Sequence, residues 1–561
     1  MNKPSMRAFE RFAKITLHRY ERYLPTAFDE SLTLLEKMNK LIEYLNEMGV
    51  QLGDVVDQWN EVMEWVINDG INDVVFDRLD EMVEDGTFET LINETVLANI
   101  NDKVDRISGE LSSQIEDVSD EVADILDRYV TERVELLVPS QFPSIISAIN
   151  YATSKHKTAN VVFEVIIESG YEITSPTSLN NGDYSHITLS SQDDVVFVSS
   201  AFNTSSNVFQ FTNATAPTFN MLVDGGGNCR MGVAVTNNSS IRFTAGSGFV
   251  NAGDNNLYVR NGSRASAVGG VFNGAGQSSS DSAGITAWGG SSVVANGAQA
   301  NNCGGYGVRC AHGSIMEFDK GNADNAGYHG IRATKGALLS CGDATARNAG
   351  IHGIYALDGS TINARMTDVT GANNTGYFAS NTSQIHANGG VANGCNIGVS
   401  SRTGSTINFR SGTANDCEEY GIHANGSSVV EARNCQISGN QEVGVYVLEQ
   451  SHINMQNSTV YGSRTDGLRV NYMSTVNAGV STIRNSGRHG VSLFRTSKVS
   501  LGSSTVWNNG EFDIRVDTGS QVFANLCLTS TNVGTGNRTP HIDDVNLYNF
   551  NTFHRLGYIT T

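Results

Sequence analysis

The sequence predicts a mainly β protein whose central part is a parallel β-helix, a coil of short strands stacked as rungs along one axis. Two observations predict it. The chain contains a repeat of about 23 residues, and apolar and polar residues alternate with period two inside each repeat. A repeat of this length, holding two or three short strands separated by glycine and asparagine, suits one coil of a β-helix.

The repeat is clearest in ten glycine–apolar pairs, which lie 23 residues apart in eight of their nine intervals and 22 apart in the other. The glycines are Gly284, Gly307, Gly330, Gly353, Gly376, Gly398, Gly421, Gly444, Gly467 and Gly490. Seven positions after each glycine comes a serine, except at Ala337, and two positions further on comes an apolar residue. The register extends outward to 13 rung starts, from Gly232 to Asp513. Rungs stacked about 4.8 Å apart predict a rod about 58 Å long.

The composition fits this fold. Glycine accounts for 58 of 561 residues and proline for 7, which suits a turn-rich solenoid and not a disordered chain. No apolar run reaches the length of a membrane span, and Met1–Arg7 leads into no apolar segment. We therefore expect no membrane insertion and no signal peptide, and synthesis in a cytoplasm. The eight cysteines show no zinc-like spacing; Cys303, Cys395 and Cys417 share a repeat phase with alanines, which predicts small buried packing positions.

The net charge of -21 is concentrated near the N-terminus. Residues 1–138 hold 31 acidic and 13 basic side chains, a balance of -18, and the remainder holds 27 against 24, a balance of -3. Neither part carries the excess positive charge of a nucleic-acid-binding protein, so no nucleic-acid partner is expected.

The N-terminal part is predicted to be helical. Apolar residues recur with gaps of four and three from Leu34 to Val66, and a second such seam runs from Ile100 to Tyr129. Coiled-coil seams need partner chains, and β-branched residues at most seam positions favour three strands, so we predict a parallel homotrimer. Pro139 is expected to end the helices. Residues 1–30, basic and aromatic, fit either a capping arm or a docking peptide for a partner protein.

The predicted organisation has five parts. They are a helical head at 1–95, a trimeric coiled-coil stalk at 96–138, the β-helix N-terminal cap and first strands at 139–231, the parallel β-helix at 232–524, and a C-terminal cap at 525–561.

Two segments resemble known families. FPSIISAINYA, Phe142–Ala152, followed by an apolar strand and by ESGYEITSP, Glu168–Pro176, resembles the N-terminal cap of pectate-lyase-like right-handed parallel β-helix proteins, in which a helix shields the open end of the solenoid. Val56–Asn93 resembles a segment found near the N-termini of tail-fibre, spike and neck-appendage proteins of phages of Gram-positive bacteria. This resemblance implies a homotrimeric spike in the virion, docked on tail or neck (connector) proteins through its N-terminal region.

Candidate ligand-binding residues lie two positions after the repeat glycine, where side chains are predicted to point outward. Aromatic rings stack on sugar faces and guanidinium groups bind phosphate, so this stripe suits a polyanionic glycopolymer. Two other interpretations stay open, because exposed strand positions favour tyrosine in any case, and because the stripe also suits a trimer contact. The candidates are Arg309, Arg332, Tyr355, Phe378, His423, Tyr446 and Arg469.

Candidate catalytic residues are Glu317, Asp319 and Asp343, because hydrolysis of a glycosidic bond usually needs two carboxylates roughly 5–9 Å apart. Glu317 and Asp319 lie two apart on one predicted strand and so share a face, and Asp343 falls on the next rung. Arg309, His312 and Arg332 are expected nearby in the register. The alternative is a solvated acidic surface. No cofactor is expected, although a divalent cation such as calcium suits such a cluster.

The expected function is that of a phage tail spike or appendage which binds and depolymerises a host cell-surface glycopolymer, teichoic acid or capsular polysaccharide, during adsorption. The alternative is a non-enzymatic receptor-binding adhesin or structural fibre with the same fold. The sequence contains no phosphate-binding loop, no His-Glu-x-x-His and no Gly-x-Ser-x-Gly motif.

Overall fold

The computed structural model describes residues 97–130, 133–157, 161–276, 281–516, 519–524 and 527–529. They fall in two units. The first is helical and contains the described residues up to Val130 together with His156 and Lys157, and the second is a β unit that contains the remaining described residues. The predicted head at 1–95, with the first coiled-coil seam, lies outside the described residues. So does the predicted C-terminal cap at 525–561, apart from residues 527–529.

The helical unit consists of α6, Leu97–Arg128, and a short parallel pairing of β1, Tyr129–Val130, with β3, His156–Lys157. In this single chain, three side chains of the predicted second seam are exposed to solvent: Val104, Ile115 and Val118. Association with partner chains remains a prediction.

The helix ends at Arg128, so the prediction that the stalk helix extends to Pro139 is wrong. Val134–Val138 forms strand β2 instead, because its residues alternate: Leu136 and Val138 are buried, while Glu135 is exposed. An apolar run of this length fits a strand as well as the end of a helix.

None of the described helices is long and apolar enough to span a membrane.

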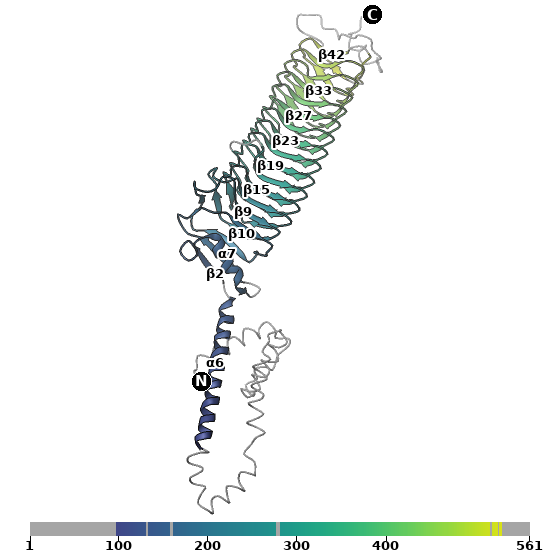
Figure 1. Cartoon of the computed structure of the whole chain (residues 1–561). Helices are drawn as coiled ribbons and strands as arrows, with labels where there is room; N and C mark the ends of the chain where they lie inside the picture. Colours follow the sequence, from purple (N-terminus) through teal and green to yellow (C-terminus); the bar gives the residue numbers. More distant parts are fainter. Residues whose placement is uncertain are drawn as a thin grey trace, which may run out of the picture. The chain divides into compact units, whose positions relative to one another are not determined.

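The β unit is a β-helix whose strands pair in parallel with the corresponding strands of the rungs before and after (Figure 1). Its strands belong to three sheets, which the chain visits in turn. Sheet 1 contains β2 (Val134–Val138), β4 (Phe163–Ile167), β7 (Ile187–Ser191), β10 (Thr215–Asn220), β13 (Ser240–Phe243), β16 (Arg264–Ser266), β18 (Ser292–Val294), β20 (Ile315–Glu317), β22 (Leu338–Ser340), β24 (Thr361–Asn363), β26 (Gln384–His386), β28 (Thr406–Asn408), β31 (Val429–Glu431), β34 (His452–Asn454), β37 (Thr475–Asn477), β40 (Lys498–Ser500) and β43 (Gln521–Phe523).

Sheet 2 has 15 strands. They are β6 (Thr177–Asn180), β9 (Asn207–Thr212), β12 (Met231–Thr236), β15 (Asn255–Arg260), β17 (Ala283–Trp288), β19 (Tyr306–Ala311), β21 (His329–Thr334), β23 (His352–Leu357), β25 (Thr375–Ala379), β27 (Ile397–Arg402), β30 (Tyr420–Asn425), β33 (Val443–Val447), β36 (Leu468–Val470), β39 (His489–Leu493) and β42 (Phe512–Val516). Thirteen of them, β12 to β42, are at the predicted rung starts, so the predicted period is confirmed and two more rungs precede it.

Sheet 3 is interrupted in its middle, where single parallel bridges from Gly248 to Thr413 continue it from rung to rung. Its strands are β5 (Glu172–Ile173), β8 (Val196–Val198), β11 (Leu222–Asp224) and β14 (Gly248–Val250) at one end, and β29 (Thr413–Asn415), β32 (Gln436–Ser438), β35 (Thr459–Tyr461), β38 (Thr482–Arg484), β41 (Thr505–Trp507) and β44 (Leu528–Thr529) at the other.

The repeat glycines are required by space. A Cβ at Gly307 would lie 2.7 Å from the Cβ of Ala323 and 2.8 Å from the carbonyl oxygen of Gly330. Real side-chain atoms do not approach so closely, so any larger residue would push neighbouring rungs or sheets apart. The glycine column read from the sequence is therefore the line along which the backbone of sheet 2 comes closest to the apolar side chains behind it, which are alanine, valine or isoleucine.

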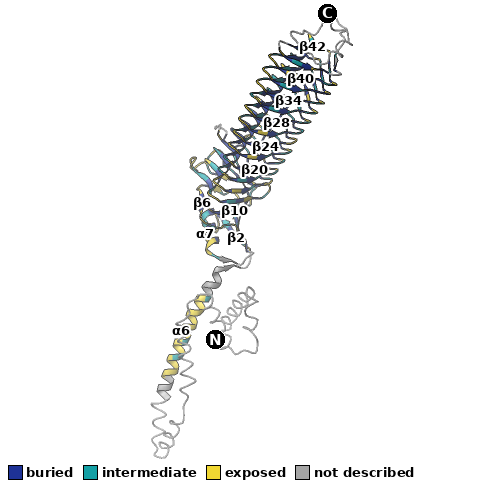
Figure 2. Cartoon of the chain, turned by 90° about the vertical axis from the view of Figure 1, so that its right-hand side faces the viewer, coloured by how far each residue is buried: buried dark blue, intermediate teal, exposed yellow. Residues whose placement is uncertain are grey.

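The interior of the coil is apolar, and Figure 2 shows buried residues along the strands and exposed ones mainly at the turns. Ala349, Ala372, Cys395 and Cys417 form one buried cluster, which confirms the shared phase of alanine and cysteine predicted from the sequence. Burial raises the pKa of the Cys395 thiol to about 11, so it stays protonated at neutral pH. All eight cysteines are buried.

The predicted amphipathic helix is α7, Ile145–Ser154, which starts with a capping box between Ser144 and Ser147. Its buried face includes Ala148 and Ile149, and it packs on β2 and β4, the first strands of sheet 1. The helix therefore covers apolar residues at the N-terminal end of the coil.

Candidate functional site

The predicted ligand stripe is a column on the outer side of sheet 2. In consecutive pairings Arg309 lies beside Arg332, then Tyr355, then Phe378, and further along Ser400, His423, Tyr446 and Arg469 follow in the same register. The seven candidates are therefore brought together, with Ser400 among them, as one line along the coil.

A second outward column, one position before the repeat glycines, fills the space between these side chains. Tyr306, His329 and His352 stack in sequence with ring centroids 5.5 and 5.0 Å apart. The guanidinium carbon of Arg332 lies 5.1 Å from the Tyr306 ring and 5.5 Å from the Tyr355 ring. The two columns together form an interlocked layer of rings and guanidinium groups, which we call the stripe layer.

The histidines of the stripe layer are neutral at pH 7. Burial, together with neighbouring positive charge, lowers the pKa of His352 and of His423 to about 4 and that of His329 to about 2. The backbone N–H of His352 donates to Nδ1 of His329 at 3.3 Å, and His423 Nδ1 lies 3.1 Å from the Ser400 hydroxyl. His423 is buried, so in this chain it supports its neighbour Tyr446 and does not face a ligand.

Part of the stripe layer remains open to solvent. Tyr355, Phe378 and Tyr446 are each half-buried and present ring surface. Arg469 is bound by the buried carboxylate of Asp466, whose Oδ2 accepts from Arg469 Nε at 2.7 Å. The layer thus offers rings for stacking on sugar faces, while at this position the positive charge is already compensated.

The candidate catalytic residues lie on a different face. Glu317 ends β20 in sheet 1 and is exposed; Asp319 follows in the turn on the same side of the chain, and Asp343 occupies the next turn. Asp319 Oδ1 accepts from the Ser340 hydroxyl at 2.7 Å and from the Gly342 N–H at 2.6 Å. Glu317 Oε2 accepts from Asn296 Nδ2 at 3.4 Å.

The basic residues expected beside these carboxylates are not on that face. Arg309 and Arg332 belong to strands of sheet 2, and the ring of His312, in the turn between the sheets, lies 4.0 Å from that of Trp288. Arg309 lies over the Trp288 and Tyr306 rings. The repeat register shows which residues lie on neighbouring rungs, but it does not show which face of the coil they occupy. Arg309, His312 and Arg332 are therefore not part of the carboxylate cluster.

Sequence reasoning missed a polar column on the carboxylate face. It lies ten positions after the repeat glycines, and the strands of sheet 1 from β20 to β37 each contribute their last residue to it. The members are Glu317, Ser340, Asn363, His386, Asn408, Glu431, Asn454 and Asn477. The same register that revealed the stripe contained this signal, because amides and carboxylates recur at one phase. We call it the polar column; such side chains suit hydrogen bonding to sugar hydroxyls.

Across the described ranges, no three His, Cys, Asp or Glu side chains are grouped so as to hold a metal ion.

Comparisons with known proteins bear on both the fold and the biological setting. Residues 420–539 match the family described as "Right handed beta helix region". The chain is 53% identical over 96 residues to the pre-neck appendage protein of Bacillus phage B103, and 52% identical over 94 residues to the preneck appendage protein of Bacillus phage PZA. Over the matched stretch, the chain is a homologue of phage pre-neck appendage proteins.

That stretch is 17% of this chain and 11% of each of the two relatives, so the chain spans only a small part of the curated proteins that it matches. Among solved structures, the periplasmic alginate epimerase AlgG is 12% identical over 76% of this chain and 88% of its own, with a TM-score of 0.30. A likeness at that score carries no inference about function. The chain thus contains a right-handed β-helix region, at residues 420–539, and a stretch of about 96 residues homologous to phage pre-neck appendage proteins.

Proposed function

We propose that the chain is a virion appendage that binds and depolymerises a host cell-surface glycopolymer, teichoic acid or capsular polysaccharide, during adsorption. It would do so as a homotrimer attached to tail or neck proteins through its N-terminal region. The homology to pre-neck appendage proteins supports the setting. The lateral faces of the coil support the ligand class.

One observation carries the proposal: the outward positions of sheet 2 align from rung to rung, about 4.8 Å apart, and six of the eight from Arg309 to Arg469 hold an arginine or an aromatic ring that is not buried. A surface that repeats along a line matches a ligand that also repeats along a line. Tyr355, Phe378 and Tyr446 supply ring faces for sugars, and Arg309 and Arg332 supply guanidinium groups.

Cleavage is assigned to the carboxylate face. Glu317, exposed at the end of β20, is the proposed general acid or base, since a bound polymer can reach its carboxylate. Asp319 is held by Ser340 and Gly342, which makes it the fixed carboxylate of the group, and Asp343 is the third member. Glu317, Asp319 and Asp343 are not grouped so as to hold a metal ion, so the proposal assigns no role to calcium.

A second candidate is a non-enzymatic adhesin or structural fibre with the same fold. It is favoured by the hydrogen bonds of Asp319, whose carboxylate joins its own rung to the next one and thereby serves the fold.

The two candidates are separated by incubating the full chain with purified wall teichoic acid and capsular polysaccharide from a host strain. Fragments of lower mass support cleavage, and retention of polymer with unchanged length supports the adhesin. If fragments appear, Glu317→Gln should slow their release about 10²- to 10⁴-fold. The matched control is Glu418→Gln, an exposed glutamate in a turn elsewhere on the coil, which should leave the rate unchanged. An unchanged rate in Glu317→Gln removes this residue from the mechanism.

A further inference from the structure

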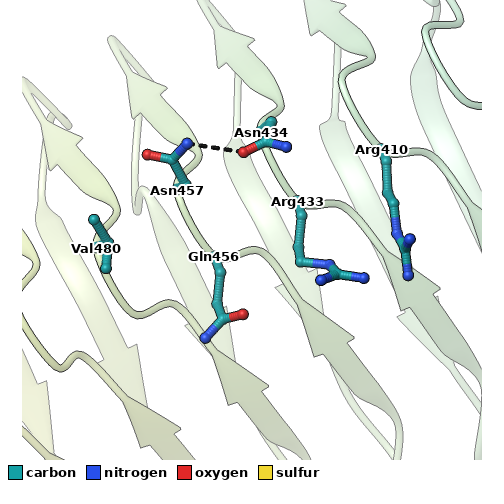
Figure 3. Close-up of a pocket in the computed structure, with 6 residues that line it drawn as sticks. All are labelled: Arg410, Arg433, Asn434, Gln456, Asn457 and Val480. Carbon is teal, nitrogen blue, oxygen red and sulfur yellow. Dashed lines mark hydrogen bonds between the residues drawn. The ribbon is translucent and has the colours of Figure 1, made fainter.

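A pocket of about 400 Å³ opens beside the turns that follow sheet 1 (Figure 3). Arg410, Arg433 and Gln456 lie twelve positions after the glycines of three consecutive rungs, so they form a line. Figure 3 shows their side chains extending from neighbouring rungs. The lining residues are Arg410, Arg433, Asn434, Gln456, Asn457 and Val480.

The pocket carries an excess of positive charge. Its two arginines share one carboxylate: Glu431 Oε2 lies 3.5 Å from Arg410 Nη2 and 3.4 Å from Arg433 Nε, and Asn454 Nδ2 donates to the same oxygen at 3.3 Å. Since Gln456 and the other lining residues are neutral, one carboxylate compensates one of two guanidinium charges. The hydrogen bonds from Arg410 Nη2 and Asn454 Nδ2 are long for charge-assisted ones, and Arg433 Nε makes an ion-pair contact without a hydrogen bond, so Glu431 binds the two arginines weakly.

In both arginine side chains the Nε atom is buried and the outer end of the guanidinium group is exposed to solvent. The Nε atoms of Arg410 and Arg433 are buried and make no hydrogen bond within the described residues. Nevertheless, 43% of the Arg410 side chain and 36% of the Arg433 side chain are exposed, so the solvent-accessible part is the outer end of each guanidinium group. Asn457 Nδ2 donates to Asn434 Oδ1 at 2.8 Å and fixes the far rim (Figure 3).

We infer that this pocket is a subsite for an anionic group, a phosphodiester or a carboxylate, on the polymer that the proposed function assigns to the coil. Arg410 and Arg433 extend from adjacent rungs, whose backbones are about 4.8 Å apart, so both guanidinium groups can donate to the oxygens of one such group. Glu431 and Glu317 belong to the same polar column, five rungs or about 24 Å apart. The subsite therefore lies on the face of the candidate catalytic carboxylates, several repeat units away along a bound chain.

The direct test labels arginines of the full chain with phenylglyoxal and reads each site by peptide mass spectrometry, with inorganic phosphate or acetate as the probe. Phosphate should protect Arg410 and Arg433 at least about fivefold relative to Arg365, which is exposed at the same phase of the repeat two rungs earlier. Equal labelling of the three arginines with and without either anion overturns the inference. This labelling experiment needs no host polymer. Its result therefore tests anion binding at the pocket independently of whether the proposed function is correct.

Variants then connect the pocket to the polymer and distinguish the two sources of the anion. Affinity is measured for poly(glycerol phosphate), for hyaluronate as a carboxylate polymer, and for neutral dextran. The double variant Arg410→Gln/Arg433→Gln should weaken binding of the preferred anionic polymer about tenfold or more, whereas Arg365→Gln should change it less than about twofold. Glu431→Gln should tighten binding, because it releases both guanidinium groups, a gain that a merely structural role would not produce. An equal effect of the double variant and of Arg365→Gln on both anionic polymers contradicts the subsite.

Discussion

The hydroxyl of Ser360 accepts a hydrogen bond from the backbone N–H of Ala337, one rung earlier, at 3.3 Å. The same contact joins other serines of the column seven positions after the repeat glycine, for example Ser428 to Ser451 at 3.1 Å. The Ser360 hydroxyl in turn donates to the Leu357 carbonyl at 2.8 Å. Each serine therefore satisfies a buried N–H at a corner where the strands no longer pair, which explains why the column recurs in the sequence.

Replacing Ser360 with alanine should destabilise the coil by about 1–3 kcal/mol, because it leaves the Ala337 N–H buried without an acceptor. The measurement is thermal unfolding at one fixed scan rate. The reverse change, Ala337→Ser, supplies the hydroxyl missing from the column and should raise stability by about 0.5–1.5 kcal/mol. Opposite signs for the two variants are expected; destabilisation by both would show that the corner has no room for a hydroxyl at 337.

Acid should destabilise the stripe layer below pH 6.5. The pKa of His352 and of His423 is lowered to about 4 from an ordinary 6.5, so between these values the unfolded chain binds protons that the folded chain does not. Stability is therefore complete above pH 6.5 and falls as the pH drops to about 4, by about 1.4 kcal/mol per pH unit for each histidine. Denaturant unfolding at pH 7 and pH 5 measures the loss.

The matching variant is His352→Phe, which keeps a ring in the stack; Phe512 holds the same place in a later rung, stacked on His489. Its stability should depend less on pH than that of the parent chain between pH 6.5 and 4. An identical pH dependence would mean that His352 is not buried as a neutral ring.

Removal of a ring from the stripe layer should weaken polymer binding. Tyr446→Ala deletes a half-buried ring that packs on Tyr420 and lies beneath the guanidinium of Arg469, and we expect about a tenfold loss of affinity for the host glycopolymer. Trp507→Ala serves as the control, because it removes a 39% exposed ring from sheet 3. An equal loss of polymer affinity in both variants, or no loss in Tyr446→Ala, would contradict ligand binding by the stripe and favour its interpretation as a trimer contact.

The exposed seam of α6 should hold the chain as a trimer. Ile115→Asp together with Val118→Asp places charges on two apolar positions that are 43% and 39% exposed in the single chain, and should convert trimers to single chains in sedimentation equilibrium. Ser113→Asp, an exposed position away from the seam, introduces the same side chain and should leave the trimer intact. A parent chain that sediments as a monomer would contradict the prediction before any variant is made.

The sequence revealed the register because the same side chain recurs at the same phase, as Gly307 and Gly330 do, where no larger residue fits. It did not reveal that His423 is buried, since an outward position shows nothing of the neighbours that cover it. The sequence wrongly predicted that Arg332 lies near Glu317. The repeat register gives the rung on which a residue lies, but it does not show that a corner of the coil separates sheet 2 from sheet 1. The segment Val134–Val138 was misassigned because five apolar-rich residues fit either a helix seam or a buried strand.

Carbene footprinting of the full chain, with and without purified host polymer, measures whether a glycopolymer lies along a lateral face of the coil. We expect protection of peptides that contain Tyr355, Phe378 and Tyr446, or of those with Glu317 and Arg433, spread over several rungs. Protection limited to the N-terminal region, or none with any surface polymer of a strain that the virion adsorbs to, would contradict it.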